Sequence, residues 1–214
     1  MKYNLPRNYL SYSAYNLWKS SRDQYRRRYY LDEDPFESHE TRFGNKIGAM
    51  VEENRHHDDP VVSQIINYPL KEHKIEVEHQ ELNLLGYLDQ FHDTEFRVLE
   101  MKTGHKNKKG KSPWDNVKVR KHKQLVYYSM LVKLKYGQVH PEVILQWLET
   151  EFKDDTTEFD GHILKSSTEE LILTGRIETY KRVIHDWEID KMIEDVLLTA
   201  EEISNDYTEW KKKN

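Results

Sequence analysis

The chain has 214 residues, enough for one sizeable domain, with a formal net charge of −5 and a mean hydropathy of −0.94. It contains no cysteine, which excludes disulfides, a thiol nucleophile and cysteine-held zinc or iron–sulfur clusters. The sequence has neither a transmembrane run nor a signal peptide, so we expect a cytoplasmic protein with no membrane partner. Because the net charge is negative, any surface that binds nucleic acid must be local.

Residues 10–31 combine a helical spacing of aromatic residues with a cluster of arginines. Aromatic rings beside arginines suit single-stranded nucleic acid, whose bases stack and whose phosphates need cations. The alternative is a helix whose rings belong to the core and whose arginines are solvated. We favour the core for Tyr15 and Trp18, and we predict nucleic-acid contacts for Arg26 and Arg27.

The periodicity predicts a second helix over residues 37–55, which carries Gly44, Gly48 and Glu52 at intervals of one turn. A glycine inside a helix costs about 1 kcal/mol relative to alanine, so we expect both glycines to lie where another element approaches closely. Glu52 is then either a carboxylate of a site on neighbouring strands or ordinary helix surface.

The stretch from 86 to 104 alternates with period two on both sides of a short polar link, which predicts a β-hairpin. With the turn centred on residues 94–95, Asp89 lies directly opposite Glu100, and Lys102 projects from the same face. The hairpin therefore predicts two carboxylates and an ammonium group side by side on a largely apolar surface.

Such a group of charges needs compensation. Adjacent carboxylates repel each other, and a divalent cation removes that repulsion. A metal held by Asp89 and Glu100 polarises a phosphodiester, and Lys102 is placed to orient the attacking water or to offset developing charge. The alternative is a hairpin with a surface salt bridge between Glu100 and Lys102.

Positive charge is concentrated directly downstream of this hairpin, although the protein as a whole is acidic. Residues 102–123 contain one acid, Asp115, among many lysines. We interpret this concentration as a phosphate-binding surface rather than a solvated loop. We predict nucleic-acid contacts for five of its lysines: Lys106, Lys108, Lys109, Lys118 and Lys121.

The remaining periodicity predicts strands at 74–82 and 142–152, helices at 114–136 and 187–213, and more strand within 168–184. The strand at 74–82 and the hairpin form a three-stranded meander, and strand–helix–strand implies a parallel crossover. We therefore expect an α/β fold with a central mixed β-sheet flanked by helices.

The motifs, in this order, resemble the PD-(D/E)XK nuclease superfamily and, within it, the RecB-like exonuclease branch, related to CRISPR-adaptation and phage exonucleases. The resemblance runs from about residue 10 to residue 136. It rests on the helix segment Gly44–Glu52, on Asp89 in Gly-x-x-Asp, on Glu100 and Lys102 in Glu-x-Lys, and on Gln124 and Tyr128 in Gln-x-x-x-Tyr.

The resemblance implies a restriction-endonuclease-like core in a single nuclease-like domain over residues 1–214. The core spans about 10–150, and the strands and long helix of 151–214 are an addition outside the family pattern. The implied activity is hydrolysis of DNA phosphodiester bonds with Mg²⁺ or Mn²⁺, by an exonuclease of recombination, repair or phage DNA processing. A recombination or processing protein is the further partner implied.

The resemblance also implies roles for individual residues. The metal ligands would be Asp89, Glu100, the backbone carbonyl of Met101 and Glu52. Lys102 would position the water, and Gln124 and Tyr128 would hold the lysine or a phosphate.

Two departures from the family pattern stand out. Gly48 occupies the position at which the family often has a metal-binding histidine, and the lack of cysteine excludes the iron–sulfur cluster of some members. The alternative function is a catalytically weak or inactive nuclease-fold module that binds nucleic acid or a protein partner. A hydrolase of a small phosphate ester is a third reading, which the extended basic flanks disfavour.

Overall fold

The computed structural model describes residues 2–137, 140–153, 158–160, 163–165 and 170–213. Its centre is a six-stranded mixed sheet in the order β1-β3-β4-β5-β8, with β2 paired to β3, and a separate two-stranded sheet is formed by β6 and β7. The strands are β1 (Leu10–Ser11), β2 (Leu70–His79), β3 (Leu82–His92), β4 (Arg97–Gly104), β5 (Glu142–Phe152), β6 (Glu158–Asp160), β7 (Ile163–Lys165) and β8 (Leu171–Val183).

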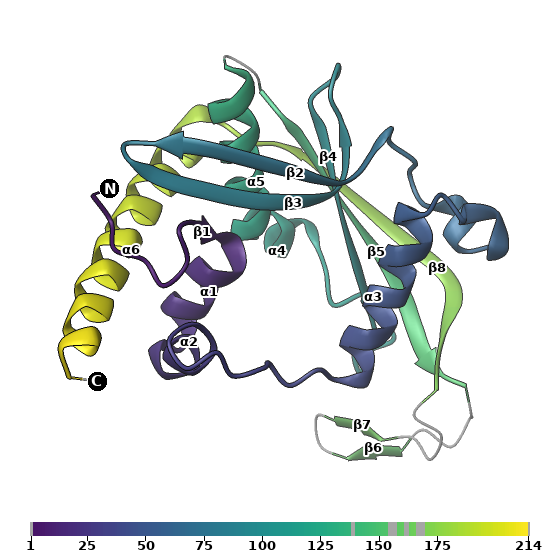
Figure 1. Ribbon diagram of the computed structural model, residues 1–214. Helices are drawn as coiled ribbons and strands as arrows, with labels where there is room; N and C mark the ends of the chain where they lie inside the picture. Colours follow the sequence, from purple (N-terminus) through teal and green to yellow (C-terminus); the bar gives the residue numbers. More distant parts are fainter. Residues whose placement is uncertain (1, 138–139, 154–157, 161–162, 166–169, 214) are drawn as a thin grey trace.

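Helices cover both faces of the main sheet, with α1, α5 and α6 on one face and α3 on the other (Figure 1). The predicted α/β fold with a central mixed sheet is therefore confirmed. The helices are α1 (Tyr12–Ser20), α2 (Arg22–Tyr29), α3 (His39–Glu52), α4 (Asn116–Arg120), α5 (Lys123–Tyr136) and α6 (Asp186–Lys213), with short 3-10 turns at η1 (His56–Asp58) and η2 (Val62–Gln64).

The strand connections follow the predicted meander and crossover. β2, β3 and β4 are antiparallel neighbours, β4 and β5 are parallel through α5, and β8 pairs antiparallel with β5. The strand predicted at 142–152 has these same bounds as β5. Its register places Lys102 of β4 beside Trp147, so the chemically important end of β4 is supported by a buried strand.

β3 changes neighbours along its length, and this creates a branch in the sheet. One edge of β3 pairs with β2 from Leu82 to Phe91, whereas the other edge pairs with β1 at Leu84 and Leu85 and with β4 only at Gln90–His92. The long β2–β3 hairpin therefore diverges from β4 and β5, as Figure 1 shows. Asp89 immediately precedes the β3–β4 ladder and lies at the branch.

A glycine lets α5 pack directly against the diverging hairpin. A Cβ atom on Gly86 would lie 2.5 Å from Cδ1 of Leu131 on α5, which no side chain could accept without a shift. The close approach brings α5, with Gln124 and Tyr128 on its first turns, beside the branch.

Two helices predicted as continuous are each broken, so these predictions were wrong in one respect. The helix expected within 10–31 breaks at Ser21, whose hydroxyl accepts a hydrogen bond from the first turn of α2. The helix expected over 114–136 breaks at His122, which has extended backbone and a ring packed on Trp114 at 5.0 Å between centroids. The second break separates α4, which contacts β8, from α5, which packs on β2, β3 and α6.

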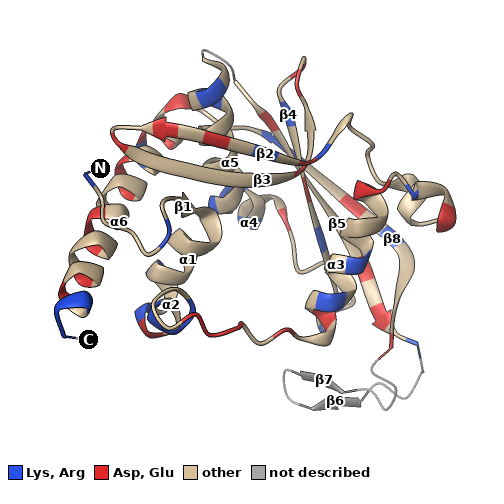
Figure 2. Ribbon diagram, in the orientation of Figure 1, with Lys and Arg blue, Asp and Glu red and all other residues tan. Residues whose placement is uncertain are grey.

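The long C-terminal helix predicted at 187–213 is confirmed as α6, which lies along α1 and α2 (Figure 1). Figure 2 shows acidic residues along its length and lysines at its end. Three of its acids bond residues of the N-terminal helices, namely Asp195 with Tyr15, Glu202 with Trp18 and Asp206 with Arg26. Among the described residues, no helix combines the length and apolar character needed to cross a membrane.

Candidate active site

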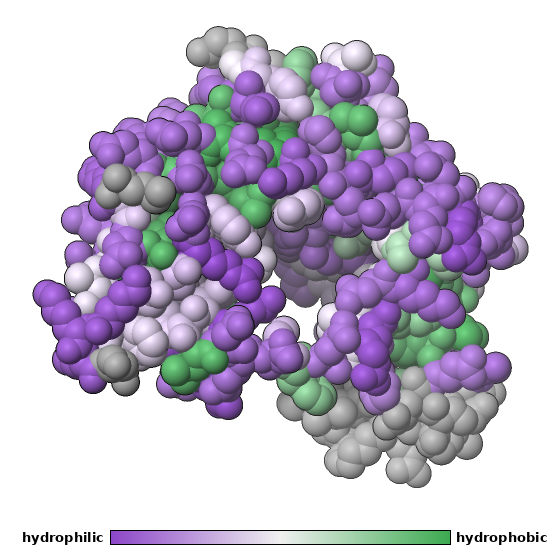
Figure 3. Space-filling model, viewed as in Figure 1, coloured by the Kyte–Doolittle hydropathy of each residue, from purple (hydrophilic) through white to green (hydrophobic). Residues whose placement is uncertain are grey.

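A cavity of about 580 Å³ opens between α3 and the strands β2, β3 and β4, with Gln124 of α5 at its wall. In Figure 3 this face of the molecule is hollowed between α3 and the β2–β3 hairpin. The charged residues of the lining are five acids and one lysine: Glu40, Glu52, Glu72, Asp89, Glu100 and Lys102.

Asp89 and Glu100 come together as the hairpin register predicts. The ladder pairs Gln90 with Leu99, and the same register places Asp89 opposite Glu100. The backbone ladder ends at this point, and the N–H of Met101 donates instead to Oδ2 of Asp89 at 2.7 Å. The branch thus fixes the orientation of the aspartate from the neighbouring strand.

Glu100 and Lys102 form the buried end of a chain of polar contacts. Glu100 is 1% exposed; one of its oxygens pairs with Nζ of Lys102, and Oε2 is buried with no hydrogen-bond partner among the described residues. Nζ of Lys102 also donates to Gln124 Oε1 at 3.2 Å, and Nε2 of Gln124 donates to the Tyr128 hydroxyl at 2.9 Å. Lys102 is therefore held on one side by Glu100 of its own motif and on the other by Gln124, which is distant in sequence.

The charges of the site influence one another strongly. Burial, and then the Glu100 carboxylate, raise the pKa of Asp89 well above its usual range, against the Met101 N–H and Lys102. Burial also raises the pKa of Glu100, although Lys102 opposes the shift. Burial acts to lower the pKa of Lys102, but Glu100 and Asp89 together raise it. The lysine stays charged beside two carboxylates whose ionised forms are disfavoured.

The two glycines of α3 have different surroundings, although both line the cavity. A Cβ atom on Gly44 would lie 3.1 Å from Oγ1 of Thr103, so the predicted close approach is confirmed there. The same prediction was wrong for Gly48, where a Cβ atom would meet nothing within 4 Å. Gly48 faces open space, and Glu52 lines the same cavity as the last residue of α3.

Glu72 is the acid of the cavity that the sequence analysis missed, because it began this strand at residue 74 whereas β2 begins at Leu70. The β2–β3 register places Glu72 opposite Asp89. The predicted strand at 74–82 was also wrong at its other end: the chain turns at Gln80 and Glu81, both with positive φ, and these two residues lack the Gly, Asn or Asp that usually marks a two-residue turn.

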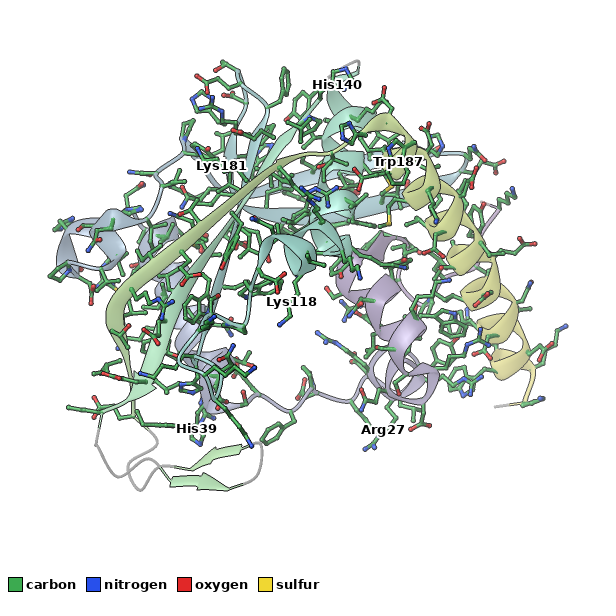
Figure 4. The ribbon with its side chains drawn as sticks, turned by 180° about the vertical axis from the view of Figure 1, so that it is seen from behind. Arg27, His39, Lys118, His140, Lys181 and Trp187 are labelled. Atoms are coloured by element: carbon green, nitrogen blue, oxygen red, sulfur yellow. The ribbon has the colours of Figure 1, made fainter. Side chains whose placement is uncertain are left out.

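The residues predicted to contact nucleic acid lie outside the cavity lining. Arg26 is ion-paired with Asp206, and Arg27 with Glu33 at 2.8 Å, so both arginines already have acidic partners. In Figure 4 Lys118 and Arg27 lie on separate helices, α4 and α2, at a distance from each other. The five lysines of the basic stretch are all solvent-exposed: Lys106, Lys108, Lys109, Lys118 and Lys121.

The donors of the cavity suit a hard divalent cation, because they are carboxylates and a buried carboxylate oxygen lacks a partner. Among the described residues, no three histidine or acidic side chains already stand close enough to share one ion. Asp89 and Glu100 are held by hydrogen bonds, whereas Glu52 and Glu72 are exposed and can rotate without disturbing the core. Binding would therefore combine a fixed pair with a mobile side chain.

No protein-family model and no curated protein sequence matches the chain. Its fold is similar to a solved structure named "Putative exonuclease" from Eubacterium rectale, with 12% identity and a TM-score of 0.56, over 92% of this chain and 82% of that one. It is also similar to a phage related exonuclease from Haemophilus somnus 129PT, with 14% identity and a TM-score of 0.51, over 90% of this chain and 83% of that one. At these identities the likeness establishes a shared fold.

Proposed function

We propose that the protein is a nuclease that hydrolyses DNA phosphodiester bonds with Mg²⁺ or Mn²⁺. The observation that carries the proposal is the Asp89–Glu100 pair at the cavity wall, with a buried, unpartnered carboxylate oxygen beside a lysine held on two sides. The fold shared with two proteins named as exonucleases supports it.

The charge of the cavity also favours a cation. Its lining holds five acids and one lysine, which would repel a phosphate group. A divalent ion between the carboxylates and the phosphate turns that repulsion into attraction. The same arrangement disfavours a site that binds a phosphate directly through cationic side chains.

The residues take distinct roles in this proposal. Asp89 and Glu100 hold the metal, together with the Met101 carbonyl and a more mobile carboxylate such as Glu52. A metal held there would polarise the scissile phosphate and would lower the pKa of a water molecule bound to it. Lys102 stays protonated between Glu100 and Gln124, where it orients the attacking water and offsets the negative charge that develops. Gln124, with Tyr128 behind it, holds the lysine in place.

The finer assignment is an exonuclease of recombination, repair or phage DNA processing, acting with a processing protein as partner. The names of the two structures of similar fold support the exonuclease part. The exposed basic stretch supports DNA, because its lysines extend beyond what a small phosphate ester would contact.

A metal-dependent cleavage assay on linear and covalently closed circular DNA tests the proposal. The wild-type protein should degrade linear DNA only with Mg²⁺ or Mn²⁺, and Asp89→Asn, Glu100→Gln and Lys102→Ala should each lose at least about 100-fold in rate. Asp93→Asn, an exposed acid at the hairpin turn, is the matched control. DNA binding by the wild-type protein without cleavage in either metal would instead identify a nuclease-fold binding module.

A further inference from the structure

We propose that Glu72 is a third carboxylate ligand of the same metal ion, beside Asp89 and Glu100. The inference rests on the proposed metal site. Glu72, Asp89 and Glu100 occupy one row across the three consecutive strands β2, β3 and β4, because each register places the next acid directly opposite the last. Neighbouring strands lie about 4.8 Å apart, and all three residues line the same cavity.

The row coincides with an interruption of both ladders. The β2–β3 pairing runs on both sides of Glu72 and Asp89 but skips these two residues, and the β3–β4 pairing ends beside Asp89. No extra residue is inserted, since the register is the same before and after the gap. Backbone pairing is therefore absent along the row that Glu72, Asp89 and Glu100 occupy.

The backbone at Glu72 has a conformation that a glutamate rarely adopts. Its φ is +42°, at the third residue of β2, at a cost of about 1–3 kcal/mol. A glycine would adopt this conformation without strain. The structure thus carries a glutamate at a position where its main chain is disfavoured, and the side chain lines the cavity.

The surroundings of Glu72 lack a protein cation. Among the described residues, the Glu72 carboxylate has neither a hydrogen bond nor an ion pair, and the nearby charges that act on it are those of Glu52 and Glu100. The ammonium of Lys102 is already shared between Glu100 and Gln124. The buried oxygen Oε2 of Glu100, at the end of the row, also lacks a partner. A cation at this row would contact both unpartnered groups.

The opposite wall leaves room for this arrangement. Gly48 contributes no side chain, and a Cβ atom there would meet nothing within 4 Å. Glu52 is one turn further, at the C-terminal end of α3, where the helix dipole disfavours a carboxylate. Glu72 lies next to Asp89 in the row, whereas Glu52 must reach from across the cavity, so the strand supplies the third ligand more directly.

Isothermal titration of Mn²⁺ into the full chain without DNA tests the inference. We expect Glu72→Gln to weaken Mn²⁺ binding by at least about tenfold. Glu78→Gln is the matched control, since Glu78 is an exposed acid of the same strand outside the cavity, and it should bind Mn²⁺ as the wild type does.

A glycine variant separates the carboxylate from the backbone. Glu72→Gly removes the side chain and also relieves the positive φ, so the unfolding midpoint without metal should rise while Mn²⁺ affinity falls. A purely structural role for Glu72 predicts a lower unfolding midpoint and an unchanged Mn²⁺ affinity. An unchanged Mn²⁺ affinity would overturn the inference.

Asp89→Asn distinguishes this inference from the proposed function. If the wild type binds Mn²⁺, Asp89→Asn does not, and Glu72→Gln binds normally, the metal site stands and the role of Glu72 is refuted. If the wild-type protein itself fails to bind Mn²⁺ or Mg²⁺, the proposed function is overturned and the inference falls with it.

Discussion

Asp89 is placed where its own charge opposes folding. Burial and the Glu100 carboxylate disfavour its ionised form, so at neutral pH the metal-free protein must hold two neighbouring acids in a costly state. Asn keeps an oxygen that can accept the Met101 N–H bond and removes the charge. We therefore expect Asp89→Asn to raise the midpoint of thermal unfolding at pH 7.5 in EDTA.

The pH dependence has a definite sign. Because the folded-state pKa of Asp89 is raised, the folded protein binds more protons than the unfolded chain above a pH of about 4. Wild-type stability should fall as the pH rises from there through the raised pKa, and the variant should show a smaller fall. Added Mn²⁺ should stabilise only the wild type, so that its unfolding midpoint becomes higher than that of Asp89→Asn. A midpoint several degrees lower for Asp89→Asn in EDTA would contradict the repulsion argument.

The residues of the site differ in how far the sequence could predict them. Asp89, Glu100 and Lys102 were predictable because a short turn fixes the register of a hairpin locally. Glu72 was missed because the turn at residues 80–81 that sets its register contains no Gly, Asn or Asp, so the sequence carries no local sign of that turn. The sequence could not predict the unpartnered oxygen of Glu100, because the burial of this oxygen depends on helices that pack from elsewhere in the chain.

At the scale of elements, α3 carries two glycines that should respond differently to substitution. Gly48 faces open space, so Gly48→Ala should stabilise the protein by about 1 kcal/mol through helix propensity alone. Gly44→Ala should gain less or lose stability, because the added Cβ meets Oγ1 of Thr103 at 3.1 Å. Urea unfolding of both variants provides the comparison, and equal gains would show that α3 can shift away from β4.

The short helix α4 provides the test of the basic stretch. Lys118 lies on α4 and Lys121 caps its end, and both are exposed. Replacing both with alanine should weaken DNA binding. The slope of the logarithm of the DNA-binding constant against the logarithm of the salt concentration should become less negative by about two. Lys212→Ala with Lys213→Ala makes the same charge change at the end of α6 and should leave the slope unaltered. Fluorescence anisotropy across a salt series measures both, and equal slopes for the two double variants would mark the stretch as solvated surface.

Elements were predicted well where their signal is local and less well where tertiary contacts decide. β5 has the bounds expected from its apolar run, because a strand buried on both faces is rich in apolar residues, although buried Gln146, Glu149 and Thr150 interrupt them. The break between α4 and α5 has no proline or glycine to announce it. It is formed by His122, whose extended backbone seats its ring on Trp114, a contact that depends on how the preceding loop folds back.

At the scale of the molecule, one carboxylate joins three helices. Asp195 of α6 accepts hydrogen bonds from Tyr15 and Lys19 of α1, with Lys19 at 2.8 Å, and from Lys123 of α5 at 3.2 Å. Lys123 also donates to the Tyr15 hydroxyl at 2.9 Å. Sequence analysis identified each helix and placed Tyr15 in the core, but Tyr15 and Asp195 are 180 positions apart, and no local pattern links them. This cluster also anchors the first turn of α5, which carries Gln124 to the site.

The hydrogen bonds around Asp195 make the packing of the three helices sensitive to pH. Burial alone would raise the pKa of Asp195, but hydrogen bonds from Lys19, Tyr15 and Lys123 lower it to about 2. The stabilisation from the ionised carboxylate is therefore fully present above a pH of about 4 and is lost as the pH falls through about 2. Asp195→Asn should lower the urea midpoint at pH 7 and match the wild type near pH 2, whereas Asp190→Asn, an exposed acid on the same helix, should change neither. Because Lys123 begins α5, Asp195→Asn should also reduce the cleavage rate without altering Mn²⁺ affinity. An unchanged urea midpoint of Asp195→Asn at pH 7 would show that the three helices are held by apolar packing alone.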